Sequence, residues 1–502
     1  MPTQVEGATV IAAPFDLCWP NTHVHMIGIG GCGMSGAAGI LLALGAKVSG
    51  SDASPFEGMG RLVSSGARIA IGHREDQLAP DTDLVVVSAA VPESNPELIA
   101  ARRRGRPVMK YANLVGELMA ARRGVAVAGT HGKSTTTAMC AHIFREGGLE
   151  PSFLVGARSE QLGGSSALGR GPHFIVESCE FDRSFLQFRP HSAAILNIEP
   201  DHLDCFKDLE DIIEAFAAFA ENVDSDGLLV CNADDTSVRR AAEAARAPVH
   251  TFGFNDDADY QAVHLRSDRG RHAFDVRFRG TVLLSTQLSI PGHYNVSNAL
   301  AAVALARHAG ADPSVVADAL TTFAGVSRRL TWRGEGRGIV ILDDYAHHPT
   351  EIRVTIEAAR YRYEPKRTWV VFQPHQYSRT RHFMEDFAGA FGLADEIIVP
   401  DVYGARESSE STDRGGSAEL VSRIHRNGGR ARYVPTLGAA ADYVARNAAE
   451  GDLVLIMGAG DVWKVADELV ERLCEPNAVR RAARPADLVS AGRGCPVPVS
   501  AA

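Results

Sequence analysis

Residues 125–144, VAVAGTHGKSTTTAMCAHIF, are the part of the sequence that most clearly indicates the fold class. Its first residues are small and apolar and predict a buried strand, the glycine-rich segment predicts a tight loop, and the residues after it predict a helix. A loop between a strand and a helix brings backbone N–H groups to the helix N-terminus, where they bind anions. The segment therefore predicts an α/β domain that binds phosphate.

The loop itself, Gly129-Thr130-His131-Gly132-Lys133-Ser134, is a short GxxGK[ST] pattern. A standard Walker A loop needs glycine at position 127, which is valine here. Lys133 is suited to neutralise phosphate charge and the Ser134 hydroxyl to bind Mg²⁺. The chain has only six lysines among 51 basic residues. A lysine here is therefore less readily explained as part of a surface turn, which is the alternative.

The same alternation of strands and helices extends in both directions from this segment and predicts parallel sheets. HVHMIGIGGCGMSGAAGILLALGAKVSGSD begins a first domain at His23, and apolar strands GIVILDD, TWVVFQP, EIIVPDV and LVLIMGAGD indicate a third. The residues after 475 are rich in Pro, Arg and Ala and lack aromatic residues, which is typical of a disordered tail. We predict an extension (1–22), three α/β domains (23–122, 123–326 and 327–475) and a tail (476–502).

Composition narrows the possible functions. A length of 502 residues suits about three domains. The formal charge of -10 argues against broad binding to a nucleic-acid backbone. The eight cysteines lack CxxC spacing, so we expect free thiols in a reducing cytoplasm. No apolar run reaches the roughly 20 residues of a membrane span, and the N-terminus lacks a basic segment typical of a secretory signal.

The first domain carries a second glycine motif, Gly28-x-Gly30-x-x-Gly33, between a predicted strand and helix. Asp52 follows at the end of the next predicted strand. This arrangement is typical of a dinucleotide site, although the pattern is weak by itself. The alternative is that the glycines only form a tight turn.

Carboxylates follow strands in the same domain as the lysine loop. Glu177 ends the apolar strand HFIVES, and a carboxylate there can complete a cation site with Ser134. We expect Glu180 to point away, because a spacing of three on one strand places side chains on opposite faces. NIEPDHLD, residues 197–204, gathers acids around His202. Two metal ions would explain both groups, and exposed turns with helix-capping acids are the alternative.

Polar clusters follow other predicted strands. Asn295 and Asn298 open an alanine-rich helix, where capping is favoured over contact with an adenine. In the third domain DDYAHHPT (343–350) and FQPHQYSRTR (372–381) each follow a strand. With Arg329 and Arg379 nearby in the sequence, contacts to substrate or nucleotide are favoured over metal binding by the paired histidines.

Taken together, the chain resembles the Mur ligase family of peptidoglycan synthesis. The motifs that carry the resemblance occur in family order over residues 23–464: HVHMIGIGGCGMSG, GTHGKSTTT, NIEPDHLD, PGHYNVSNALAA, SRRL, DDYAHHPTEI, FQPHQYSRT and GAGD. The resemblance implies a Rossmann-like N-terminal domain for a UDP-sugar, a P-loop ATPase-like central domain with a parallel sheet, and a Rossmann-like C-terminal domain for an amino acid.

The resemblance also implies an activity. ATP phosphorylates the lactoyl carboxylate of UDP-N-acetylmuramate to an acyl phosphate, and L-alanine then displaces phosphate. ATP and Mg²⁺ are the implied cofactors, and the substrates are the implied partners of a cytoplasmic monomer or weak homodimer, with no nucleic acid and no membrane insertion. The alternatives are a ligase for a recycled murein peptide, an NAD-dependent oxidoreductase and a non-catalytic nucleotide-binding regulator.

The resemblance assigns residues to five groups. The implied catalytic residues are Lys133, Glu177, His202, Arg329 and Asp344, and the implied metal ligands are Ser134, Glu177 and His202. The implied ATP site comprises Gly129, Thr130, His131, Gly132, Lys133, Ser134, Thr135, Asn295, Asn298 and Arg329. The implied UDP-sugar site comprises Gly28, Gly30, Gly31, Gly33, Asp52, His73 and Ser88. Tyr345, His348, His375 and Arg379 are implied for the amino acid.

The chain departs from the family pattern at two places. Glu177-Ser-Cys179-Glu180-Phe181-Asp182 stands where the family usually has Glu-Ala-Asp-Glu-Ser-Asp. The first implied metal ligand is therefore kept, and the alternative is that Glu180 shares its role. Gln376 replaces the arginine of the usual Pro-His-Arg-Tyr. A neutral amide holds a carboxylate less firmly than an arginine does, so we expect a weakened contact with L-alanine unless Arg379 compensates. No lysine occurs between residues 208 and 365, so we predict no carbamylated lysine.

Overall fold

The computed structural model describes residues 19–202, 205–405, 407 and 416–473. The predicted tail, Asp204 and most of the predicted N-terminal extension lie outside these residues. The chain divides into two compact units, Met1–Ser327 and Arg328–Ala502. Among the described helices, none is long and apolar enough to cross a membrane.

The N-terminal sheet of the first unit has five parallel strands in the order β3-β2-β1-β4-β5. Apolar residues of β1 face both sides, with Val24 and Met26 in one core and Ile27 in another. The strand order reverses beside β1, which is where open α/β sheets bind ligands. The elements are β1 (His23–Ile27), α1 (Cys32–Ala43), β2 (Lys47–Asp52), α2 (Met59–Ser64), β3 (Arg68–Ile71), η1 (Glu75–Gln77), β4 (Leu84–Val87), α3 (Pro96–Arg103), β5 (Val108–Lys110) and α4 (Tyr111–Ala120).

The second sheet of this unit has ten strands in the order β15-β14-β13-β12-β11-β10-β6-β9-β7-β8. β6 lies between β10 and β9, so the lysine loop leaves the middle of the sheet. The elements are β6 (Arg123–Ala128), α5 (Lys133–Glu146), β7 (Ser152–Ser159), β8 (Gly164–Ala167), β9 (His173–Glu177), η2 (Phe181–Gln187), β10 (Ser192–Ile195), α6 (Leu209–Glu221), β11 (Leu228–Asn232), α7 (Thr236–Ala242), β12 (Val249–Gly253), β13 (Tyr260–Asp268), β14 (Arg271–Phe278), β15 (Thr281–Gln287), α8 (Tyr294–His308) and α9 (Pro313–Thr322).

The second unit holds a six-stranded sheet in the order β16-β17-β21-β18-β19-β20. Its central strands β17, β21 and β18 are parallel and nearly fully buried. The elements are β16 (Thr331–Gly336), β17 (Ile339–Asp344), α10 (Pro349–Tyr363), β18 (Arg367–Phe372), α11 (Tyr377–His382), α12 (Met384–Ala390), β19 (Glu396–Val399), α13 (Gly416–Arg426), β20 (Ala431–Tyr433), α14 (Leu437–Asn447), β21 (Asp452–Met457) and α15 (Trp463–Leu473).

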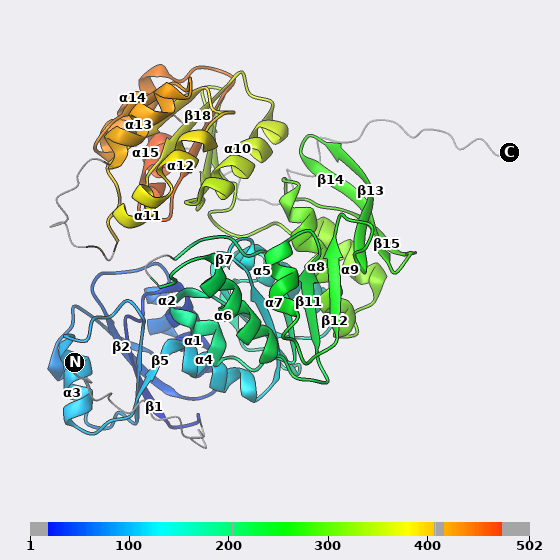
Figure 1. The fold of residues 1–502 in the computed structure, drawn as a ribbon. Coiled ribbons are helices and arrows are strands. Elements are labelled where there is room, and N and C mark those ends of the chain that lie inside the picture. The colour runs from blue at the N-terminus through cyan, green and yellow to red at the C-terminus, as the bar shows by residue number, and fades with distance from the viewer. Residues whose placement is uncertain (1–18, 203–204, 406, 408–415, 474–502) are drawn as a thin grey trace, which may run out of the picture. The chain divides into compact units, whose positions relative to one another are not determined.

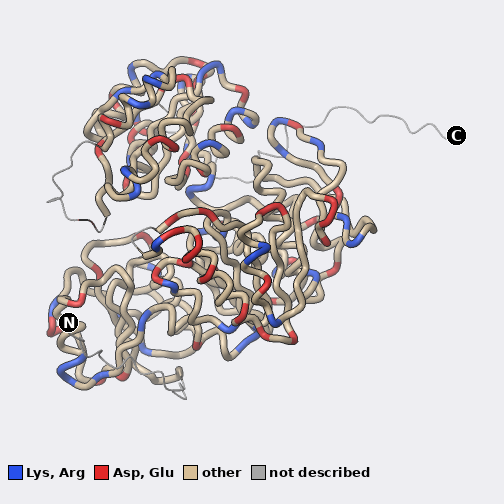
Figure 2. Tube along the Cα trace, in the orientation of Figure 1, with Lys and Arg blue, Asp and Glu red and all other residues tan. Residues whose placement is uncertain are grey.

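The predicted α/β class with three sheets built on parallel strands is confirmed. Antiparallel strands occur at sheet edges and were not singled out from the sequence: β8, the β13–β15 meander and β16. In Figure 1 the meander is drawn as the long green arrows labelled β13, β14 and β15. Figure 2 shows acidic and basic residues interspersed along the described chain, as expected for a modest net charge.

Candidate active site

The lysine loop joins β6 to α5 and depends on its two glycines. Gly132 has a φ of 82°, and a Cβ there would lie 2.5 Å from Oδ1 of Asn298. Gly129 has a φ of 141°, and a Cβ there would lie 2.9 Å from the Cβ of Leu196. Residues other than glycine rarely adopt these backbone conformations. Glycine thus lets the loop approach α8 and the residues directly after β10.

Lys133 is held over its own loop. Its Nζ donates to the carbonyl of Thr130 at 3.1 Å and to Oε2 of Glu180 at 2.9 Å. The side chains of Lys133 and Glu180 are only 12% and 3% exposed. Burial alone lowers the pKa of Lys133, but the Glu180 carboxylate raises it above the ordinary value. Lys133 therefore forms a buried ion pair with Glu180.

Glu177 lies against the adjacent residue of the loop. Ser134 Oγ donates to its Oε1 at 3.0 Å, and the backbone N–H of Gly156 donates to its Oε2 at 2.6 Å. A Cβ on Gly156 would lie 2.7 Å from either carboxylate oxygen. The glycine therefore allows the carboxylate to lie flat against β7. A carboxylate and a hydroxyl oxygen at this separation form a donor set that suits a hard cation such as Mg²⁺.

The expectation that Glu180 points away from the loop is wrong. It assumed that the strand continues, but β9 ends at Glu177 and the chain enters the 3₁₀ turn η2. Strand alternation no longer applies beyond Glu177. As a result, Glu177 and Glu180 reach neighbouring residues of one loop, Ser134 and Lys133.

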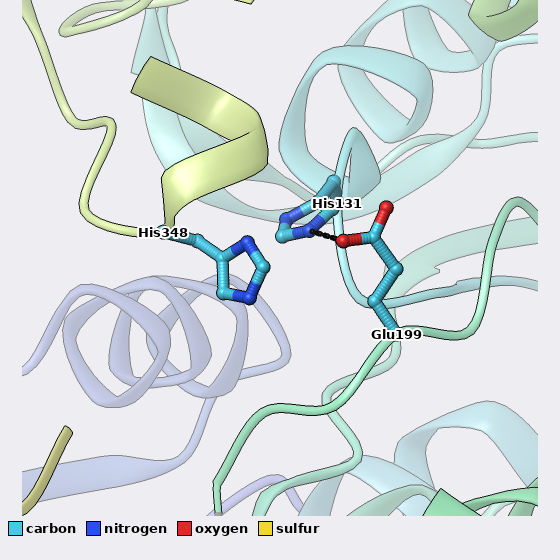
Figure 3. Close-up of side chains that lie close together, drawn as sticks. All are labelled: His131, Glu199 and His348. Carbon is cyan, nitrogen blue, oxygen red and sulfur yellow. Dashed lines mark ion pairs between the residues drawn. The ribbon is translucent and has the colours of Figure 1, made fainter. Parts of the chain in front are cut away.

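The NIEPD segment after β10 also meets the loop. The backbone N–H of His131 donates to Asn197 Oδ1 at 2.7 Å, and that of Glu199 donates to Thr130 Oγ1 at 2.9 Å. Figure 3 shows the His131 ring beside the Glu199 carboxylate, with Nε2 and Oε2 3.5 Å apart. Nε2 of His202 lies 3.6 Å from Oε1 of Glu180. Glu180 therefore stands between Lys133 and His202, a role that the sequence did not reveal.

The expectation that the two asparagines cap α8 is also wrong. The N-cap residue is His293, without a side-chain cap bond. Asn295 donates instead to the Pro291 carbonyl at 2.6 Å, and Asn298 donates to Asn295 Oδ1 at 3.0 Å. Asn295 and Asn298 lie inside the first turns and face inward, so their side chains do not reach the helix's free N–H groups. The structure instead places Asn298 beside Gly132 of the lysine loop.

The first glycine loop is fixed by Asp52. The backbone N–H of Gly30 donates to Oδ2 of Asp52 at 2.8 Å, and a Cβ on Gly30 would lie 2.7 Å from that oxygen. A Cβ on Gly28, whose φ is 78°, would lie 3.0 Å from the Cβ of Ser88. A Cβ on Gly33 would lie 2.4 Å from the Tyr111 hydroxyl. The structure thus brings the glycines, Asp52 and Ser88 together at one edge of the sheet.

His73 follows β3 at the same edge. Its Nδ1 lies 2.9 Å from Ser51 Oγ and 3.0 Å from Oε1 of the buried Glu97. The backbone N–H of Gly72 donates to the Asp52 carbonyl at 2.8 Å. Sequence reasoning did not find Glu97, because nothing in PELIAARR distinguishes a buried glutamate from the usual exposed one in the first turn of a helix.

In the second unit, Asp344 ends β17 and is almost fully buried. It accepts from the backbone N–H groups of Leu330 and Ala346, each at 2.7 Å. Burial raises the pKa of Asp344 to about 6. Arg329 pairs with Glu351 at 3.4 Å and lies 5.5 Å from the ring centre of Tyr345. Glu351 was not predicted, although it also accepts from the N–H of His347.

The remaining predicted amino-acid residues lie near the starts of α10 and α11. His348 caps α10, because its Nδ1 accepts from the N–H of Thr350 at 3.3 Å. An Arg379 nitrogen lies 3.2 Å from Nδ1 of His375. Gln376 is buried and has a φ of 67°, and its N–H donates to the Tyr403 carbonyl at 2.8 Å.

The five cysteines in the described part of the chain are free thiols, as expected: Cys32, Cys140, Cys179, Cys205 and Cys231. The other three cysteines of the sequence lie outside the described residues.

Models of three known domains match the chain in order. They are the Mur ligase family catalytic domain (residues 23–123), the Mur ligase middle domain (127–306) and the Mur ligase glutamate ligase domain (328–460). The chain belongs to the Mur ligase family. A UDP-N-acetylmuramate–L-alanine ligase of Pelotomaculum thermopropionicum is 44% identical over 90% of this chain and 98% of its own length. A protein of the same name from Alkaliphilus metalliredigens is 41% identical over 89% and 97%.

Two solved ligase structures are similar to this chain. The UDP-N-acetylmuramate–alanine ligase of Thermotoga maritima has a TM-score of 0.78 and 30% identity, covering 92% of this chain and 100% of its own. A murein peptide ligase of Psychrobacter arcticus has a TM-score of 0.70 and 27% identity, covering 90% and 98%. Both similarities extend over nearly the whole of each chain.

Proposed function

We propose that this Mur ligase joins L-alanine to the lactoyl carboxylate of UDP-N-acetylmuramate and converts ATP to ADP and phosphate. It thereby supplies a precursor for peptidoglycan, with its consequences for cell-wall synthesis, cell shape and division. The names of relatives that align over nearly their full length support this substrate pair. We further propose a cytoplasmic enzyme, monomeric or weakly dimeric.

One observation carries the ATP-dependent part of the proposal. The glycine loop at the start of α5 presents a buried lysine beside Glu180, and a serine hydroxyl beside Glu177. The N–H groups of the loop would hold ATP phosphates, and Lys133 would offset their charge. Such a loop supports phosphate binding, and a hydride-transfer enzyme would leave Lys133 and Glu177 unused.

We assign the first of two cations to oxygen ligands that already lie close together. Ser134 and Glu177 would hold one Mg²⁺, and His202 would hold a second. Mg²⁺ supplies charge neutralisation where anionic oxygens of two substrates approach each other. The Gly156 N–H keeps one Glu177 oxygen oriented, which leaves the other for the cation in place of the Ser134 hydrogen bond.

The reaction has two steps in this proposal. A carboxylate oxygen of the sugar attacks the γ-phosphorus of ATP, which gives an acyl phosphate and ADP. The neutral amine of L-alanine then attacks the acyl carbon, and phosphate leaves with its bonding electrons while the amine loses a proton. Lys133 and Arg329 would stabilise charge on the transferred phosphoryl group.

The remaining assignments follow the family pattern. Gly28, Gly30, Gly31, Gly33, Asp52, His73 and Ser88 would bind the UDP-sugar, and the amides of Asn295 and Asn298 would bind adenine. The loop residues Thr130, His131 and Thr135 would contribute to ATP binding. Asp344 would contribute to catalysis together with Arg329, while Tyr345, His348, His375 and Arg379 would bind L-alanine. We retain 23–122, 123–326 and 327–475 as the proposed UDP-sugar, ATP and amino-acid domains.

The similarity to a murein peptide ligase supports a second candidate, in which the amine belongs to a recycled peptide. ADP release separates the two functions when the purified protein, ATP, Mg²⁺ and UDP-N-acetylmuramate are mixed with L-alanine, glycine, L-serine or L-alanyl-γ-D-glutamyl-meso-diaminopimelate. We expect the highest kcat/KM with L-alanine. Turnover with the tripeptide alone would favour the second candidate, and no turnover with any amine would refute both.

A further inference from the structure

A row of polar side chains lies buried on one face of the N-terminal sheet. His23 and His25 alternate along β1 and share a face with Ser49 of β2, which is paired in register with His25. Ser49 Oγ lies 2.8 Å from Nε2 of His23 and 2.9 Å from Nδ1 of His25. All three side chains are buried. Polar groups in such a position must satisfy one another, because water does not reach them.

Glu97 of α3 connects this row of buried polar side chains to His73. Its carboxylate is fully buried, with Oε2 2.6 Å from Nε2 of His25 and Oε1 3.0 Å from Nδ1 of His73. Burial alone raises the pKa of Glu97, but hydrogen bonds from His25 and Ser51 hold it below its usual range. Glu97 is therefore ionised at neutral pH and only accepts hydrogen bonds.

The Glu97 carboxylate determines the tautomer of the His73 ring. Nδ1 faces the Glu97 carboxylate and Ser51 Oγ, so Nδ1 carries the proton. In a neutral ring Nε2 is then a hydrogen-bond acceptor. The His73 side chain is 23% exposed, and within the described part of the chain its Nε2 has no hydrogen-bond partner. The ring thus combines a fixed buried edge with an accessible one.

We propose that Glu97 is a positioning residue for the sugar nucleotide, which fixes His73 as the Nδ1–H form so that Nε2 accepts from an N–H or O–H group of the ligand. This inference rests on the proposed function, which places His73 in the UDP-sugar site. It assigns His73 to a donor group of the uridine or sugar and leaves the phosphates to other groups. His25, whose Nδ1 lies beside Ser49 Oγ, holds the other oxygen of the carboxylate.

Glu97→Gln tests the proposal with little change in shape. In the wild-type protein, both His25 and His73 face a carboxylate oxygen of Glu97. The glutamine side chain instead presents an N–H group to one of these two rings. The His73 ring can then adopt the opposite tautomer. We expect the KM for UDP-N-acetylmuramate to rise about tenfold, the upper end of the loss expected for one neutral hydrogen bond. The KM values for ATP and L-alanine and kcat should change less than about twofold. Glu93→Gln, at an exposed carboxylate paired with Arg102, is the matched control and should change none of them.

A spectroscopic measurement on the wild-type protein keeps the test decisive if Glu97→Gln does not fold. Correlation of ring nitrogens and protons in protein with ¹⁵N-labelled histidine, assigned with His73→Gln, should show a protonated Nδ1 and an unprotonated Nε2. UDP-N-acetylmuramate without ATP should shift the Nε2 resonance. In a folded Glu97→Gln variant, the Nε2–H form should become detectable.

Two results would overturn the inference: an Nε2–H ring in the free wild-type protein, or an unchanged sugar-nucleotide KM in a folded Glu97→Gln variant. Equal losses in kcat and all three KM values would indicate a general structural role and would also overturn it. Failure of the proposed function is distinguishable. In that case L-alanine gives no turnover, yet calorimetric titration still shows UDP-N-acetylmuramate binding that Glu97→Gln weakens.

Discussion

Replacing Glu180 by glutamine removes the charge that accompanies Lys133. Both side chains are at least 88% buried, with nitrogen and oxygen 2.9 Å apart. Removing one partner of a buried pair costs about 3–5 kcal/mol, since the other charge remains desolvated. Glutamine keeps one hydrogen-bond acceptor, so we expect the free energy of unfolding of the first unit to fall by about 3 kcal/mol in the absence of nucleotide.

Bound nucleotide should reduce this loss. If Lys133 exchanges Glu180 for ATP phosphates, a non-hydrolysable ATP analogue with Mg²⁺ provides the missing negative charge. The difference between wild type and Glu180→Gln should then shrink to about 1 kcal/mol, the scale of an ordinary hydrogen bond. Urea unfolding followed by circular dichroism, with and without the analogue, measures both differences. Glu221→Gln, at an exposed carboxylate that pairs with Arg246, is the control and should stay within about 0.5 kcal/mol of wild type.

An equal loss with and without the analogue, in a variant that still binds it, would refute this reasoning. It would mean that Lys133 stays with Glu180 when the nucleotide is present. A loss below about 1 kcal/mol without nucleotide would show that the pair is too well solvated for burial to matter.

Three further predictions concern the other proposed residues. Lys133→Ala should lower kcat at least about a hundredfold, and Glu177→Ala should abolish Mg²⁺-dependent ADP release while Glu180→Ala only weakens it; near-normal activity of Lys133→Ala would contradict the ATP site. The raised pKa of Asp344, about 6, makes the folded state bind its proton more tightly than the unfolded state, so its contribution to stability is present below about pH 4 and is lost as pH rises through 6. The difference in unfolding free energy between wild type and Asp344→Asn should therefore move by about 3 kcal/mol in favour of the variant between pH 3 and 7, and a constant difference would contradict the raised pKa. Gln376→Arg should lower the L-alanine KM measured by ADP release; if it leaves that KM unchanged while Arg379→Ala abolishes alanine binding, Arg379 already holds the carboxylate.

The sequence predicted the strands that carry the sites better than it predicted the side chains around them. HFIVES and GIVILDD are apolar because their strands are covered on both faces, so β9 and β17 were placed within one residue. The antiparallel meander has alternating partly buried and buried residues, as in RHAFDVRF, and its pattern is less distinctive beside such apolar runs.

Local sequence patterns did not predict the position of a side chain where a tertiary contact or the end of a strand determines it. Glu180 reaches Lys133 because the strand ends three residues earlier, and Asn298 faces Gly132 because α8 packs against α5. Glu97 is separated from His25 by 72 residues, so only the folded sheet brings the two together. The roles proposed for these residues depend on such distant contacts, which sequence periodicity does not encode.

The most direct test of the central claim is product formation by the purified full-length chain. With UDP-N-acetylmuramate, L-alanine, ATP and Mg²⁺, mass spectrometry should detect UDP-N-acetylmuramoyl-L-alanine in amounts equal to the ADP and phosphate released. Omission of either UDP-N-acetylmuramate or L-alanine should stop the formation of all three products. ADP release without an amide product, or product formation without ATP, would contradict the account.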